Sequence, residues 1–164
     1  MPRFAFIQEY IEHRSPQMCE SYVLGGKPQY QIASLEADAG LALPAELKEF
    51  YEFAYGGRLG GYKLLTIPDI VSMLGEIHER YAGTPIPDSI LPFAYLIDVG
   101  DFIILDIARA TAEGTLVLDG FHELSPEQWK GICYGLETWL REMVASEFEP
   151  FWLEGGGYPP FRRL

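Results

Sequence analysis

Residues 43–57 constrain the fold most, because they carry the signals of one complete amphipathic helix. Pro44 suits the first helical position, where its missing N–H would have no partner in any case. Gly56 and Gly57 are typical of a helix end. The apolar residues at helical spacing are Leu47, Phe50, Tyr51 and Ala54. Such a helix needs a second structural layer to cover its apolar face.

That second layer is predicted by short runs rich in β-branched and aromatic residues. Residues 93–97 and 102–107 are two such runs, and the four residues between them predict a β-hairpin in which Gly100 takes a left-handed conformation. Residues 115–119 and 62–66 predict two further strands. We therefore expect a mostly antiparallel sheet of about four or more strands packed against helices.

The last predicted element is a long helix that opens at Ser125, Pro126 and Gln128, a sequence typical of a capping box. Its apolar positions run from Trp129 to Val144, and we expect Trp139 to belong to the core. Helices, then strands, then a closing helix predict a single α+β domain over residues 1–164, with a core at about 30–148. The remaining residues, 149–164, form an aromatic tail rich in glycine and proline. Two interpretations of Phe151, Trp152, Tyr158 and Phe161 stay open, a strap against the body or a contact surface.

Charge limits the classes of partner. The chain has 24 acidic against 12 basic residues, a net charge of −12. Such a chain repels nucleic acid and anionic membrane surfaces, and it attracts a cationic protein. No apolar run approaches the length of a membrane span, and the N-terminus does not resemble a signal peptide. We expect a cytoplasmic protein, either monomer or homodimer.

Catalytic motifs are missing from the sequence. His13, His78 and His122 each stand alone, without the His-Glu-x-x-His spacing of a zinc enzyme. Cys19 and Cys133 lie far apart, so we expect free thiols that are buried or half-buried. We expect no catalytic residue, no metal and no cofactor.

Acidic residues do gather in one part of the chain. Between Tyr81 and Trp129 there are eight, with Arg109 as the one arginine and no lysine. We expect them to form an acidic rim on one side of the sheet, which would speed the encounter with a basic protein. The candidate partner-binding residues are Asp98, Asp101, Asp106, Glu113 and Asp119.

The order of these features resembles the SUKH superfamily, which includes fungal cell-wall regulators of the Smi/Knr type and bacterial toxin-immunity proteins. One departure is Gly56 after Tyr55, where the family often has asparagine. The matching residues are Ile32, Leu35 and Glu36; Leu43, Pro44, Lys48 and Phe50; Tyr55, Gly56 and Gly57; Ile90 to Ala94; Gly100 to Ile103, Leu105 and Asp106; and Leu136, Trp139 and Leu140. The resemblance implies an α+β protein-binding module without catalytic residues, in bacteria typically an immunity protein that blocks a secreted toxin.

Three hypotheses follow. The first is an immunity protein whose acidic sheet edge and hairpin loop bind a basic toxin. The second is a small hydrolase or metal-dependent enzyme that uses Asp98, Asp101 and Asp106. The third is a regulatory or scaffold domain that binds its partners through the aromatic tail.

Overall fold

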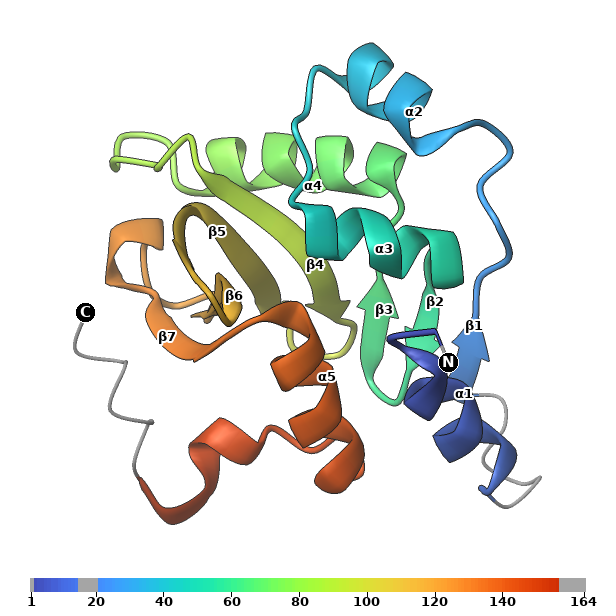
Figure 1. The fold of residues 1–164 in the computed structure, drawn as a ribbon. Coiled ribbons are helices and arrows are strands. Elements are labelled where there is room, and N and C mark those ends of the chain that lie inside the picture. Colours follow the sequence, from blue (N-terminus) through green and yellow to red (C-terminus); the bar gives the residue numbers. More distant parts are fainter. Residues whose placement is uncertain (1, 15–20, 157–164) are drawn as a thin grey trace.

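Among residues 2–14 and 21–156, which the computed structural model describes, seven strands form one antiparallel sheet (Figure 1). Each strand pairs with the next one along the chain, so the order in the sheet is the order in the sequence. The strands are β1 (Tyr22–Leu24), β2 (Gly57–Leu59), β3 (Tyr62–Leu64), β4 (Ile90–Leu96), β5 (Phe102–Thr111), β6 (Gly114–Gly120) and β7 (Lys130–Tyr134). The predicted α+β class and antiparallel sheet are confirmed.

Helices cover both faces of the central strands. The helix α4 lies along one face, and α1, α3 and α5 gather on the other (Figure 1). The described helices are α1 (Ala5–Glu12), α2 (Ile32–Ala39), α3 (Ala45–Phe53), α4 (Ile67–Arg80) and α5 (Leu136–Ala145), with short 3-10 helices η2 (Pro126–Gln128) and η3 (Phe151–Gly156). The longest of them, α4, has 14 residues. No helix in the described ranges combines the length and the apolar character that a membrane span requires.

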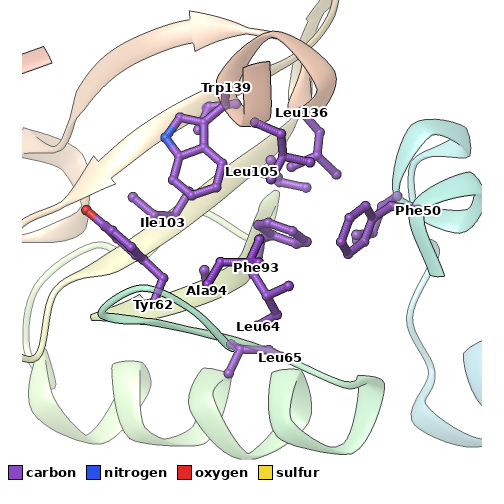
Figure 2. Close-up of a cluster of buried hydrophobic side chains, with 14 of the residues drawn as sticks. Phe50, Tyr62, Leu64, Leu65, Phe93, Ala94, Ile103, Leu105, Leu136 and Trp139 are labelled. Atoms are coloured by element: carbon purple, nitrogen blue, oxygen red, sulfur yellow. The ribbon is translucent and has the colours of Figure 1, made fainter. Parts of the chain in front are cut away.

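Side chains of β5 alternate between two hydrophobic clusters, as the pleat of a strand requires. Phe102 and Ile104 belong to the cluster that contains Ile77 of α4. Ile103 belongs to the larger cluster on the opposite face, together with Trp139 of α5. Figure 2 shows this second cluster, with Trp139 placed over the strands. The complete burial of Trp139 confirms that it belongs to the core.

The predicted hairpin is confirmed. β4 and β5 pair from Tyr95 with Phe102 to Ile90 with Asp106, and Gly100 in the connecting turn has a φ of 85°. The two other predicted strands correspond to β3 and β6.

The predicted closing helix begins later than its sequence signal indicates. Ser125 and Gln128 do form a capping box, but it opens only the 3-10 turn η2, and Trp129 already has extended backbone angles. β7 follows and pairs with β6, and α5 begins only after Gly135, whose φ is 94°. The prediction of one continuous helix from Ser125 was therefore wrong. The segment after the capping box pairs with the edge of β6, and this pairing outweighs the local capping signal.

The two glycines after α3 also have a different role from the one predicted. The helix ends at Phe53, and Ala54 is already extended, so neither glycine caps it. Gly57 is the first residue of β2, and a Cβ atom there would lie 2.2 Å from the carbonyl oxygen of Val23. Glycine is therefore needed here because β1 approaches the backbone closely.

The start of α5 is held by a side chain from α3. Glu46 accepts hydrogen bonds from the backbone N–H of Leu136 at 2.9 Å and of Glu137 at 2.8 Å. A carboxylate in this position satisfies two unpaired amides and interacts favourably with the positive end of the helix dipole. Arg3 completes the cluster through ion pairs with Glu46 and Glu137.

Candidate functional site

The five predicted acids lie at separate places: two lie within strands β5 and β6, and three lie in the turns that precede these strands. Asp98 is exposed in the turn between β4 and β5, and Glu113 is exposed in the turn between β5 and β6. These turns flank a strand of ten residues, which spans about 30 Å at ~3.3 Å per residue. The two carboxylates therefore face different ends of the sheet, and the expectation that all these acids form a rim on one side of it is wrong in this respect.

Asp106 is inside the protein, with 4% of its surface exposed. Its carboxylate accepts a hydrogen bond of 2.7 Å from Arg109 Nε and one of 3.2 Å from the backbone N–H of Ala108. These bonds lie where the pairing of β5 with β6 skips from Asp106 to Ala110. The carboxylate thus stabilises an irregular strand segment, and the expectation that it is exposed was wrong because helices cover both faces of β5.

Asp119 is also buried, with 8% of its surface exposed. Its Oδ2 atom accepts a hydrogen bond of 3.1 Å from the indole Nε1 of Trp152. Trp152 comes from the predicted tail, and its burial supports the strap interpretation for this part of the tail. Tyr158 and Phe161 lie outside the described residues.

Asp101 is half-buried and positions the loop after β6. Its Oδ1 atom accepts a hydrogen bond of 3.0 Å from the backbone N–H of His122 and lies 2.7 Å from His122 Nδ1. No local pattern predicts this pair, because 21 residues separate its members. The register of the sheet explains it, since Phe102 pairs with Gly120 and brings the two ends together.

Asp101 and Asp119 line one pocket of about 290 Å³, at the end of the sheet where β4 turns into β5. Tyr62 contributes a phenol, while Leu96 and Ile103 contribute apolar wall. The remaining side is formed by Phe121 and by the strap residues Pro150, Trp152 and Leu153. The pocket therefore combines two carboxylates with aromatic and aliphatic surface, and it contains no lysine or arginine from the described chain.

Tyr62 is the polar group that sequence reasoning missed. Burial raises the pKa of its hydroxyl, and the negative charges of Asp119, Asp101 and Glu149 raise it further. The residue as a whole is 3% exposed, and its hydroxyl forms no hydrogen bond with any residue in the described ranges. Tyr62 is thus a neutral, unpaired hydroxyl beside two carboxylates. Only the alternation of β3 could have indicated its burial, and nothing in the sequence indicated its neighbours.

The turn beside this pocket exposes apolar side chains next to an acid. Ile97 is 39% exposed and Val99 is 49% exposed, with the exposed Asp98 between them. Leu96, the residue before this tip, lines the pocket. The tip of this turn therefore presents apolar surface and a carboxylate side by side.

A second hollow is wider and more open. It has a volume of about 770 Å³ and is lined by the loop at residues 27–31, by α2 and by α3. Its charged residues have both signs, and Lys48 pairs with Glu36 at 3.8 Å. Because charges of both signs line this open groove, it does not favour a partner of one charge. The hairpin end of the sheet is therefore the better candidate site.

Metal ligands and thiols can be located among the described residues. These residues include no cluster of three or more His, Cys, Asp or Glu side chains that could hold a metal ion. Burial raises the pKa of the Cys133 thiol to about 12, with smaller contributions from Glu142 and Glu46. Cys133 is a buried free thiol, as expected, whereas Cys19 lies outside the described residues.

Comparison with known proteins gives one finding. The model of the SMI1 / KNR4 family (SUKH-1) matches residues 29–142, which is more than half of the chain. A search of curated proteins finds no match. The matched segment contains Tyr62, Asp101 and Asp119 of the pocket, while Trp152 lies beyond it.

Proposed function

Because the chain belongs to the SMI1 / KNR4 family (SUKH-1), we propose that it is a non-enzymatic protein-binding domain. We propose further that it is an immunity protein, which neutralises a basic toxin domain by direct binding in the cytoplasm. The net charge of −12 supports a cationic partner, since complementary charge raises the rate of encounter.

The observation that carries this proposal is the tip of the β4–β5 turn, formed by Ile97, Asp98 and Val99. The two apolar side chains supply surface that gains by leaving water, and the carboxylate between them attracts a basic surface. Of the five acids, Asp98 is assigned to direct contact, and Asp101 and Asp119 to the pocket beside it. Asp106 and Glu113 are assigned no contact, because one is internal and the other faces the far end of β5.

The two other hypotheses have less support. A hydrolase acting through Asp98, Asp101 and Asp106 needs carboxylates that work together, but Asp106 is bound to Arg109 and lies several residues inside β5. A scaffold that binds through the tail needs exposed aromatic residues, whereas Trp152 is buried against the body.

The test is a capture experiment with a charge-reversal variant and a matched control. The purified protein is immobilised, exposed to lysate of its native host, and washed at low and then at high salt, and retained proteins are identified by mass spectrometry. We expect one basic protein at near-stoichiometric amount, released as salt screens the charges.

The captured protein is then produced and measured against two variants with the same change in net charge, Asp98→Lys and Glu113→Lys. We expect Asp98→Lys to weaken binding at least about tenfold, the size of one lost charge-assisted contact, and Glu113→Lys to change it little. Equal loss in both variants would contradict the assigned contact. An acidic partner, or one held equally at high salt, would contradict the proposed function.

A further inference from the structure

The pocket between Tyr62, Asp101 and Asp119 has features that the proposed function does not use. Its carboxylates lie against apolar walls rather than in open solvent, and the phenol beside them lacks a hydrogen-bond partner among the described residues. The Tyr62 hydroxyl opens to the pocket, where it is available to a polar group that enters.

The Asp101 carboxylate has acceptor capacity left. Both contacts with His122 use Oδ1, and Oδ2 accepts no hydrogen bond from a residue in the described part of the chain. An ionised carboxylate can accept about four hydrogen bonds over its two oxygens, so Oδ2 is available to a donor that enters the pocket. The Tyr62 hydroxyl oxygen can accept a bond from the same donor.

The size and the walls of the pocket define what this donor is attached to. A volume of about 290 Å³ lies at the lower end of the range for small-molecule sites, so one long side chain suits it better than a large ligand. Leu96 and Ile103 offer aliphatic surface for a methylene stem, and Phe121 and Trp152 add aromatic surface. An aliphatic stem with a cationic, hydrogen-bond-donating end describes lysine and arginine.

We propose that this pocket receives a lysine or arginine side chain of the partner protein, whose cationic end is bound by Asp101 and Tyr62 in the presence of the nearby negative charge of Asp119. This inference rests on the proposed function, because it places one anchor residue of the partner beside the β4–β5 turn. The tip of the turn then contacts the partner around this anchor residue and excludes water from it, as the outer residues of an interface do. The strap residue Trp152 forms one wall, so the anchor site combines the family domain with a segment that follows it.

The test uses small probes and therefore does not depend on the toxin. N-acetyl-L-arginine methylamide and N-acetyl-L-lysine methylamide are titrated into the full-length ¹⁵N-labelled protein, and the three indole N–H signals are followed by NMR. N-acetyl-L-citrulline methylamide is the matched control, because it has nearly the shape of the arginine probe without its charge. The signals are assigned with Trp129→Phe, Trp139→Phe and Trp152→Phe variants.

We expect both cationic probes to shift the Trp152 signal saturably, with millimolar dissociation constants, whereas the citrulline probe has no effect at the same concentration. The Trp129 signal should stay unchanged, because that ring lies in the cluster on the opposite face of the sheet. Saturable shifts with citrulline, or no shift of Trp152 with either cation, would overturn the proposal.

Two variants complete the test. Tyr62→Phe removes only the hydroxyl and should weaken the cationic probes about tenfold, the effect of one hydrogen bond to a charged group. Glu113→Gln lowers the negative charge at the far end of β5 and should leave probe affinity unchanged. If Tyr62→Phe and the unmodified protein bind the cationic probes with equal affinity, the proposal that the Tyr62 hydroxyl binds the cation is wrong. If the probes fail while the captured partner binds in an Asp98-dependent way, the pocket proposal is wrong and the proposed function stands.

Discussion

Trp152 Nε1 donates a hydrogen bond of 3.1 Å to Asp119 Oδ2, which joins the segment after α5 to the end of β6. The bond is buried, and the Trp152 ring also contacts Trp139, with ring centroids 6.5 Å apart. One residue of the predicted tail thus belongs to the core and closes one side of the pocket.

We predict that Trp152→Phe destabilises the protein more than Trp139→Phe does. Both substitutions replace an indole with a smaller ring, but Trp139 Nε1 has no hydrogen-bond partner within the described residues. Trp152→Phe additionally removes a bond to a buried carboxylate, which is worth about 1.5–3 kcal/mol. Urea unfolding of the two variants measures the difference. If Trp139→Phe costs as much or more, the bond to Asp119 contributes little.

We predict that Glu46 is more important for stability than its neighbour Glu49. Both residues pair with Arg3, but only Glu46 also accepts the two backbone bonds at the start of α5. Glu46→Ala should lower the free energy of unfolding by about 2–3 kcal/mol, because it leaves helix amides unpaired. Glu49→Ala should cost less than about 1 kcal/mol, as expected for an exposed ion pair. Similar losses in chemical denaturation of the two variants would contradict the capping role.

We predict effects of opposite sign for two glycine substitutions. Gly135→Ala should destabilise the protein by more than about 1 kcal/mol, because its φ is 94° and a Cβ atom would lie 2.4 Å from the carbonyl oxygen of Glu113. Gly75→Ala should stabilise it by about 0.5–1 kcal/mol, since Gly75 lies within α4 and has open space around it. Differential scanning calorimetry should show a lower Tm for the first and a higher Tm for the second. A higher Tm for Gly135→Ala would contradict the observed turn.

We predict that Glu137 contributes to the loss of stability in acid. Burial raises the pKa of its carboxyl group, but hydrogen bonds and charges from Arg3 and Arg141 outweigh this and bring it below the ordinary 4.5. A lowered pKa in the folded state stabilises the protein above about pH 4.5, and this contribution is lost as the pH falls through the folded pKa.

The Glu137→Gln variant should therefore be less stable than the unmodified protein at neutral pH, and the difference should shrink as the pH falls below about 4.5. Urea unfolding at a series of pH values measures this. If the difference in free energy of unfolding stays constant from neutral pH into acid, the charge of Glu137 does not contribute to stability.

Much of the fold could be predicted because the signals were local. The β4–β5 hairpin depends on two apolar runs and on Gly100, all of which are close together in the sequence. β7 could not be predicted in the same way, since the capping box at Ser125 is real but is followed by a strand. Gly131 and Gly135 were the signals against a continuous helix, because glycine is unfavourable within one.

The candidate site was predicted only in part. Asp98 lies in an exposed turn, as its sequence neighbours indicate. Asp106 and Asp119 were expected at the surface, but helices on both faces of the sheet leave them buried. The pocket itself combines Tyr62, Asp101 and Trp152, which are far apart in the chain, and their proximity depends on strand register that no local pattern reveals.

The most direct test of this account is hydrogen–deuterium exchange of the protein with and without its captured partner. We expect the partner to slow exchange in the β4–β5 turn at residues 96–101 and in the strap at residues 150–153. Exchange in the β5–β6 turn around Glu113 and in α2 should stay the same. Protection confined to α2 or to the β5–β6 turn would contradict the account, because the partner would then bind away from the hairpin and the pocket.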